Sequence, residues 1–288
     1  MCGRYVSSKS SSDLLDEFDA VDETDGTLFE PDYNVAPTTT VRAVVTRFPR
    51  EQSIGIDSQA GEIADAKTAG RTGGVVAPRT AVRQLRAVHW GLVPSWAKDV
   101  SSGNRMFNAR AETVPTKSAF SRAFAKRRCL IPTDGWYEWR KTTDRAGAPS
   151  KQAYYMTSPD GRSIALAGLY EFWRPRTGAD AEPGDWLVSA TIITVASQGE
   201  LAGIHERMPL VLDPRDWDRW LDPAADGPLD LLAGWDEAGG EGLELRPVAD
   251  LVNSVKNNGP ELLEPVAEPA QSLESAPSLE RAQSLELF

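Results

Sequence analysis

The sequence predicts an α+β fold with mostly antiparallel strands, and three observations lead to that prediction. Short runs rich in β-branched and aromatic residues fill much of the second half of the chain. Turn-rich connections separate these runs, and few segments show the helical spacing of apolar residues. Strands and helices do not alternate in the rhythm that builds a parallel sheet, so the helices are expected to interrupt antiparallel strands.

Two helices and two strands are expected in the first half of the chain. The segment SDLLDEFD (12–19) predicts a short helix with Ser12 as its cap, because its apolar residues fall on one face. The segment LRAVHWGLVPSW is typical of a strand that ends at Pro94. The remaining elements predicted here are a strand at 41–48 and a helix at 118–127, whose basic residues oppose its apolar face.

The second half of the chain is expected to consist mainly of strands. Connections such as KTTDRAGAPS and RPRTGADAEPGD separate them. One amphipathic helix follows at 213–222, with Trp217 and Trp220 on the same face. The predicted strands are RCLIP (128–132), GWYEWR (135–140), QAYYMT (152–157), SIALAGLYEFW (163–173) and WLVSATIITVA (186–196).

One domain is expected over residues 1–266, and two segments are not expected to contribute to its core. Residues 50–81 are small, polar and glycine-rich, which indicates either a long flexible insertion or an irregular hairpin. Residues 267–288 form an acidic tail with an imperfect repeat of QSLE and PSLE. Such a tail buries little apolar surface, so we expect disorder or at most a marginal helix.

The composition is that of a soluble globular protein, with 41% hydrophobic and 25% charged residues. No apolar run is long enough to span a bilayer, and the chain does not start with a hydrophobic signal segment. Two cysteines are too few for a disulfide framework or a structural zinc site. We therefore expect a cytoplasmic protein with no membrane contact, no metal and no cofactor.

The charge of the chain is unevenly distributed. The formal net charge is -11, which by itself argues against binding to nucleic acid. The segment 105–141 nevertheless holds nine basic and three acidic side chains, a local balance of 9 − 3 = +6. It is either a solvated basic surface or a surface that binds anions.

Cys2 follows the initiator methionine directly. A small second residue usually allows Met1 to be removed, which would give Cys2 a free α-amine beside its thiol. The amine titrates near ~8 and the thiol near ~8.5, so both are partly reactive at neutral pH. The alternative interpretation is that the cysteine follows Met1 by chance and has no chemical role.

His205 and Glu138 are candidates for proton transfer. His205 interrupts an apolar context in GIHERMPLVL, which indicates a loop over a site or else a structural histidine in a turn. Glu138 lies among aromatic residues in DGWYEWR. Partial desolvation would raise its pKa and make it a usable acid or base, unless it is an exposed glutamate paired with Arg140. The other histidine, His89, is expected to lie in a sheet.

Asn108 and Arg110 are candidates for binding a phosphate. They are two residues apart in MFNARAETV, so in a strand they would share one face. A guanidinium beside an amide suits a phosphate and an adjacent polar atom. Asn34 precedes Pro37 in YNVAPTT and could belong to nothing more than a turn.

Seven motifs follow one another along residues 1–266 in the order found in one family. They are MCGRY, YNVAPT, WGLVPSW, NARAETV, RCLIPTDGWYEWR, IHERMPLVL and RPVADLVNSVKNNGPELLEP. In this order they resemble the SRAP (SOS response-associated peptidase) family of abasic site processing proteins. These proteins crosslink to damaged single-stranded DNA and shield the lesion during the DNA damage response.

The resemblance implies a fold, an activity and a set of residues. The fold would be a single β-rich domain with a barrel-like core, flanking helices and a basic DNA channel, and we expect a monomer. Met1 would be removed autoproteolytically, and Cys2 would form a thiazolidine with the aldehyde of an abasic site, with lyase activity as a further possibility. The catalytic residues would be Cys2, Asn108, Glu138 and His205. Residues expected to bind single-stranded DNA are Gly3, Arg4, Asn34, Trp90, Trp96, Arg110 and Arg207.

The expected chemistry gives each residue a role. Glu138 would protonate the sugar ring oxygen, His205 would move protons at the imine stage, and Asn108 would hold the α-amine. The arginines would fix flanking phosphates. Trp90 and Trp96 would either stack on unpaired bases or belong to the core.

Two other functions are compatible with an N-terminal cysteine. Class II glutamine amidotransferases also begin with MCG, but they need an oxyanion hole, glutamine-binding arginine and aspartate residues, and a synthetase domain. None of these is recognisable in the sequence. The other alternative is a DNA-binding module in which Cys2 is inert.

Overall fold

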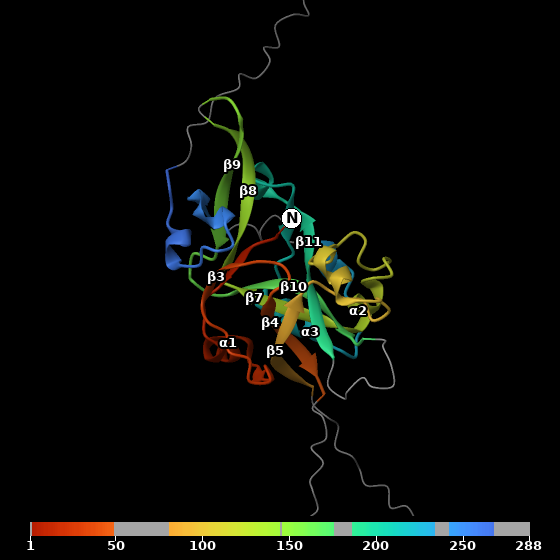
Figure 1. Cartoon of the computed structure of the whole chain (residues 1–288). Helices are drawn as coiled ribbons and strands as arrows, with labels where there is room; N and C mark the ends of the chain where they lie inside the picture. The colour runs from red at the N-terminus through yellow and green to blue at the C-terminus, as the bar shows by residue number, and fades with distance from the viewer. Residues whose placement is uncertain (1, 49–80, 145, 176–185, 234–241, 268–288) are drawn as a thin grey trace, which may run out of the picture.

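The computed structural model describes residues 2–48, 81–144, 146–175, 186–233 and 242–267. The predicted insertion at 50–81 and the predicted tail at 267–288 lie outside these residues, apart from Ala81 and Ala267. Strands dominate the described part and form two sheets, with short helices beside them (Figure 1).

The larger sheet closes on itself. Its strands, in order of pairing, are β12 (Arg207–Pro209), β11 (Leu187–Ala196), β10 (Ile164–Trp173), β7 (Arg128–Thr133), β4 (Thr40–Arg47), β5 (Val82–Trp90) and β2 (Val21–Asp22). β11 also pairs with β5 in parallel, through Ser189 opposite His89 and Ala190 opposite Trp90. This pairing joins β11, β10, β7, β4 and β5 into a closed ring. The remaining pairings of the ring are all antiparallel. We call these five strands the ring.

The smaller sheet is antiparallel throughout. Its order is β13 (Glu244–Val248), β9 (Pro149–Thr157), β8 (Gly135–Thr143), β1 (Tyr5–Ser7) and β3 (Asp32–Val35). β7 leads directly into β8, so the ring and the smaller sheet share one continuous stretch of chain. A short strand, β6 (Asn108–Arg110), runs parallel to β11 at its edge.

Three α-helices flank the sheets: α1 (Ser11–Phe18), α2 (Ser121–Lys126) and α3 (Trp217–Leu221). α1 is capped by Ser10 rather than by the predicted Ser12. Ser10 and Asp13 bond each other's backbone N–H groups in a capping box, which Ser12 could not form. The 3-10 helices are Val100–Arg105, Gly199–Gly203, Pro214–Asp216, Asp230–Ala233, Asp250–Asn253 and Pro260–Leu263.

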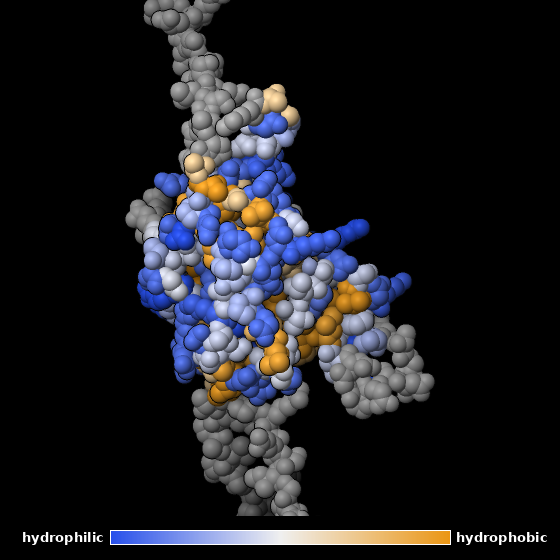
Figure 2. All heavy atoms as spheres, turned by 60° about the vertical axis from the view of Figure 1, so that its left-hand side comes forward, coloured by the Kyte–Doolittle hydropathy of each residue, from blue (hydrophilic) through white to orange (hydrophobic). Residues whose placement is uncertain are grey.

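The core is continuous through the ring. Trp90, Trp136 and Trp220 are among its largest fully buried side chains, and the Phe18 ring of α1 stacks on Trp217 at 4.5 Å. The outer surface carries mostly hydrophilic residues on the face that Figure 2 shows, with hydrophobic side chains in smaller patches. The prediction of a mainly antiparallel α+β fold with a barrel-like core is confirmed.

Three predicted strands differ from the observed ones by more than one residue in extent. The strand predicted to end at Pro94 ends at Trp90, because Gly91 has φ +147° and turns its N–H toward Ala190 O. A Cβ there would lie 2.8 Å from Gly103 O, so only glycine fits. β8 and β9 form a longer hairpin than predicted, since the pairing continues to Thr143 opposite Pro149.

The basic segment 105–141 does not form a single anion-binding surface. Arg128 is 3% exposed, and its guanidinium donates to the backbone oxygens of five residues. Those residues are Phe124, Ala125, Trp220, Asp222 and Ala225. Arg128 therefore ties α2 and the end of α3 to β7 and contributes nothing to the surface. Arg128 is therefore not part of the solvated or anion-binding surface expected of this segment.

Replacing Arg128 should weaken the fold. Arg128→Met keeps a similar length but leaves buried carbonyls without donors, so the free energy of unfolding should fall by about 3 kcal/mol. Urea unfolding followed by circular dichroism measures this change. Arg162→Met is the control, because Arg162 is 76% exposed and its loss should change stability by less than about 0.5 kcal/mol. Equal stability of the two variants would contradict the structural role of Arg128.

Candidate active site

The start of the chain is held inside the smaller sheet. β1 pairs with β8 on one side and with β3 on the other. The N–H of Tyr137 donates to the carbonyl oxygen of Arg4 at 3.0 Å, which continues the β1–β8 ladder beyond β1. Extending that antiparallel register by one residue places Gly3 opposite Glu138. The N-terminal end thus lies beside β8, close to β11 (Figure 1).

Asn108 contacts Cys2 directly. β6 holds Asn108 beside Ile192 of β11, and the Asn108 Nδ2 group donates to the Cys2 carbonyl oxygen at 2.7 Å. The other side-chain atom of Asn108, Oδ1, is buried and has no hydrogen-bond partner among the described residues. It is an available acceptor next to the start of the chain.

Glu138 is buried, with 3% of its surface exposed. Burial raises the pKa of Glu138 to about 7, since a charged carboxylate loses its hydration there. The alternative of an exposed glutamate paired with Arg140 is therefore excluded, and the Arg140 guanidinium instead lies 4.8 Å from the centre of the Tyr154 ring. A carboxyl group with this pKa can give or take a proton near neutral pH.

The Cys2 thiol is buried in the same place. Burial raises the pKa of Cys2, and the negative charge of Glu138 raises it further, while the backbone of Arg4 acts in the opposite direction. The thiol consequently stays protonated at neutral pH, which makes it a poor initial nucleophile. The effect of Glu138 on Cys2 also means that the two side chains are within electrostatic reach of each other.

His205 lies in the loop between the 3-10 helix Gly199–Gly203 and β12, as predicted for a loop residue. Its Nδ1 is 3.0 Å from both the backbone nitrogen and the backbone oxygen of Arg207. Burial lowers the pKa of His205, and Lys141 of β8 contributes in the same direction. The ring is therefore neutral at pH 7 and lies within electrostatic reach of β8. His89 lies in β5, within the ring, as expected.

Arg4 and Asn34, which are predicted to bind DNA, hold a segment of the C-terminal part. Arg4 Nη1 donates to Asn34 Oδ1 and to Val252 O, both at 2.8 Å. Asn34 is 4% exposed, and its amide donates to the backbone oxygens of Val252, Ser254 and Asn257. Asn34 thus holds this segment in place, and its contact with a DNA strand stays a prediction.

Arg207 and Arg110 differ in their surroundings. The Arg207 guanidinium forms two hydrogen bonds with the carboxylate of Glu112 and another with Thr194 O. Arg110 is exposed on the outer face of β6 and has no salt bridge within the described part of the chain. Glu112 was missed by the sequence analysis, although it belongs to the same NARAETV motif.

Of the two alternatives for the tryptophans, Trp90 fits the core and Trp96 does not. Trp90 is 1% exposed, donates its Nε1–H to Phe107 O at 2.9 Å and packs against Tyr5 of β1, so it cannot stack on a base. Trp96 is 53% exposed and lies in the connection after β5. Trp139, next to Glu138, was not predicted as a site residue.

Trp139 borders a shallow groove of about 450 Å³ on the outside of the β8–β9 hairpin, with Ser150, Lys151, Asp250 and Asn253. Its Nε1–H donates to Asn253 Oδ1 at 2.7 Å, which fixes the plane of the indole. The aromatic run around Glu138 is the signal in the sequence that could have identified it.

Neither a metal site nor a membrane segment emerges from the residues described. No group of three or more His, Cys, Asp and Glu side chains among them is arranged to hold an ion. None of the helices in the described ranges is long and apolar enough to cross a bilayer.

Comparisons with known proteins agree with the motifs. The family model described as "SOS response associated peptidase (SRAP)" matches residues 1–255. The chain is 32% identical to the abasic site processing protein YoaM of Bacillus subtilis, across 92% of this chain and 98% of that protein. It is also 32% identical to abasic site processing protein HMCES of Gallus gallus, over 64% of this chain and 58% of that protein.

Solved structures share the fold. A protein from Bacteroides thetaiotaomicron superposes with a TM-score of 0.66 at 19% identity, covering 92% of this chain and all of that chain. A protein from Bordetella bronchiseptica has a TM-score of 0.58 at 21% identity, covering 86% of this chain and all of that chain. Because the family model covers most of the sequence and YoaM aligns over nearly its whole length, the chain belongs to the SRAP family.

Proposed function

We propose that this protein binds single-stranded DNA at an abasic site and forms a thiazolidine crosslink to it through Cys2 after Met1 has been removed. The observation that supports this most is the pairing of two buried groups, a protonated Cys2 thiol and a Glu138 carboxyl group with a pKa of about 7. The names of the relatives agree, since YoaM and HMCES are called abasic site processing proteins.

The reaction uses both groups of an N-terminal cysteine. The α-amine attacks the aldehyde carbon of the open-chain sugar, and loss of water gives an imine. The thiol sulfur then adds to the imine carbon while its proton passes to the nitrogen, which closes a five-membered thiazolidine. A buried thiol that stays protonated fits this order, because the amine reacts first and the thiol second.

Three residues assist at defined steps. Glu138 in its protonated form gives a proton to the sugar ring oxygen and so promotes ring opening. Asn108 orients Cys2 through its Nδ2 group, and its unpartnered Oδ1 accepts a hydrogen bond from the freed α-amine. Nδ1 of His205 lies within hydrogen-bond distance of both the N–H and the carbonyl oxygen of Arg207, so it can accept from one or donate to the other. Either tautomer of the ring is therefore stabilised, and Nε2 is the nitrogen that exchanges protons with the substrate.

The same groups serve the two related activities that we propose. Autoproteolytic removal of Met1 would expose the α-amine, with Glu138 as proton donor to the leaving group. Lyase activity would proceed from the imine, which acidifies the neighbouring carbon and allows elimination of the 3′ phosphate. A reducing cytoplasm would keep the Cys2 thiol free for the crosslink.

The DNA strand is proposed to lie across β6 and the β8–β9 hairpin. Arg110 is exposed there and can pair with a phosphate. Gly3 lies opposite Glu138 in the β1–β8 ladder, where a side chain would narrow the approach to the carboxyl group. Arg207 acts through its pair with Glu112, which holds the strand that follows His205.

Blocking the α-amine should abolish the crosslink. A short non-cleavable extension ahead of Cys2 converts the amine to an amide and keeps the thiol, so heat-stable crosslinking to abasic single-stranded DNA should vanish on a denaturing gel. Binding to intact single strands should persist. The same extension at the C-terminus is the matched control. Full crosslinking by the N-terminally extended protein, with the extension verified by mass spectrometry, would rule out the amine mechanism.

Cys2→Ala tests the thiol separately. This variant keeps an α-amine, so it should form only an imine, which borohydride traps and heat destroys. A wholly inactive Cys2→Ala variant combined with an active N-terminally extended protein would instead indicate ordinary thiol catalysis.

The crosslinking rate should depend on the protonation of Glu138. Because burial raises its pKa to about 7, the acid form is lost as the pH rises above that value, while the free α-amine, which titrates near ~8, is gained. The rate should therefore pass through a maximum and decline on the alkaline side. Glu138→Gln should lower the rate by about 10²-fold and remove this decline. Single-turnover crosslinking from pH 5.5 to 9 gives both quantities. An unchanged decline in the variant would assign it to another group.

Arg110 should account for one phosphate contact. Arg110→Ala should weaken binding of undamaged single strands and reduce the slope of log affinity against log salt by about 0.7. Fluorescence anisotropy at several salt concentrations measures the slope, with Arg162→Ala as control. If both variants bind like the parent protein, Arg110 is not a phosphate contact.

A further inference from the structure

A second cavity, of about 950 Å³, lies at the end of the ring remote from Cys2. The final residues of β4 and β10, the start of β11 and the middle of β5 border it. Asn108 and Arg207, in contrast, pair with the later residues Ile192 and Ala196 of β11. In Figure 1, β4 ends in the lower part of the molecule, whereas the N-terminal end lies in the upper part. The cavity is therefore separate from the candidate active site.

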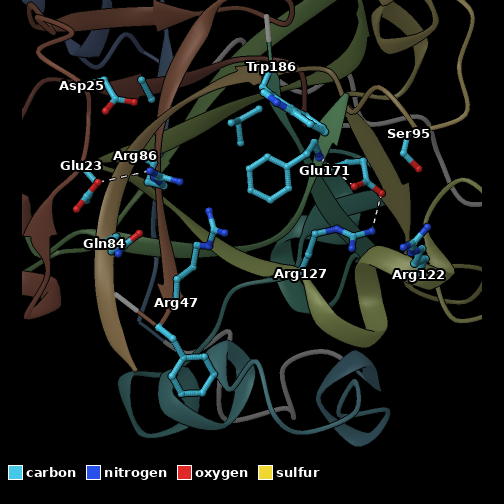
Figure 3. Close-up of a pocket in the computed structure, with 14 residues that line it drawn as sticks. Glu23, Asp25, Arg47, Gln84, Arg86, Ser95, Arg122, Arg127, Glu171 and Trp186 are labelled. Atoms are coloured by element: carbon cyan, nitrogen blue, oxygen red, sulfur yellow. Dashed lines mark hydrogen bonds and ion pairs between the residues drawn. The ribbon is translucent and has the colours of Figure 1, made fainter. Parts of the chain in front are cut away.

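Four arginine side chains converge on this cavity, as Figure 3 shows: Arg47, Arg86, Arg122 and Arg127. Arg127 is fixed by a 2.6 Å salt bridge to Glu171, whose Oε1 accepts the N–H of Phe172. The Nε of Arg127 is buried and has no hydrogen-bond partner within the described residues. Arg86 lies 3.5 Å from Glu23, a long contact for a salt bridge.

Arg47 and Arg122 have no salt bridge in the described part of the chain, although they belong to a strongly acidic protein. The Arg47 guanidinium lies 5.0 Å from the centre of the Phe172 ring. Burial raises the pKa of Tyr170, and the charges of Arg47, Arg127 and Arg86 act against that rise. Three guanidinium groups of the cavity lining thus lie within electrostatic reach of one buried hydroxyl. Like charges held together in this way favour an anion among them.

The rim of the cavity is aromatic. Phe172 and Trp186 meet edge to face at 6.5 Å, and Trp186 is 56% exposed. Phe48 also lines the cavity and is 49% exposed. Large aromatic side chains left open beside guanidinium groups suit a flat, electron-rich ring that carries a phosphate.

We propose that this cavity binds a nucleotide, with its phosphate on Arg47 and Arg122 and its base against Trp186 and Phe172. The four arginines and the three acidic lining residues give a balance of 4 − 3 = +1, which suits a phosphate monoester better than a triphosphate. The acidic groups can accept hydrogen bonds from the sugar or the base. The nucleotide is either a free nucleoside 5′-monophosphate or the 5′-phosphorylated end of a DNA strand.

Calorimetric titration of the full chain tests the proposal. Deoxyadenosine 5′-monophosphate should bind at sub-millimolar concentration, while deoxyadenosine and inorganic phosphate should each bind at least tenfold more weakly. Arg47→Gln combined with Arg122→Gln should weaken nucleotide binding at least tenfold, and Trp186→Ala should weaken it as well. Arg215→Gln, an exposed arginine remote from the cavity lining, is the matched control and should bind as the parent does.

A second arm identifies the source of the nucleotide. A 5′-phosphorylated oligonucleotide that competes with the mononucleotide, and loses affinity in the same double variant, indicates a DNA end; binding of the mononucleotide alone indicates a free metabolite. Either result supports the site. Absence of nucleotide binding, or equal binding by the double variant and the parent, overturns it. Crosslinking to abasic DNA, measured on the same double variant, should be unchanged, so failure of the nucleotide site and failure of the Cys2 chemistry are distinguishable.

Discussion

The insertion of β1 between β3 and β8 is the constraint on which the candidate active site depends. The first residues of a chain usually fray, because few contacts hold them. Here they form an inner strand of the smaller sheet, with neighbours on both sides. Cys2 is fully buried as a result, and Glu138 is desolvated beside it. The unusual protonation of both groups follows from this single arrangement of backbone.

Support for that strand comes from the ring. Trp90, at the end of β5, contacts Tyr5 of β1 and hydrogen-bonds the segment that leads into β6. β6 in turn brings Asn108 to Cys2. Trp90 thus supports the site by packing. The N–H of Gly91, in the turn that follows, donates to Ala190 O of β11. Trp90 was expected either to stack on a base or to belong to the core. It belongs to the core and supports the positions of Cys2 and Asn108.

Arginine has two distinct uses in this acidic chain. Arg4, Arg128 and Arg207 donate to backbone oxygens, to Asn34 or to Glu112, so they hold segments of chain that lie far apart in sequence. Arg47, Arg110 and Arg122 have no salt bridges in the described residues and face solvent or a cavity. The second group is the one available for phosphates. The net charge of the whole chain conceals this division.

Much of the fold could be predicted from the sequence, because local patterns determine it. The alternation of β-branched and aromatic residues located the strands from β7 to β11, and the motif order identified the family. Cys2, Asn108, Glu138 and His205 were singled out from their local chemistry and from that family resemblance. The end of β5 at Trp90 and the full length of the β8–β9 hairpin were not predicted, because backbone pairing with distant residues determines them.

The tertiary structure alone decided which polar side chains are free. Arg128 and Arg110 look alike in a basic stretch, yet one is buried among carbonyls and the other is exposed. Asn34 looks like a turn residue, yet it holds a segment more than 200 positions later. The type of residue determines which bonds it can make, and the sequence supplies that information. Burial and partners depend on contacts between distant segments, so only the folded chain determines whether a given arginine binds its own backbone or a ligand.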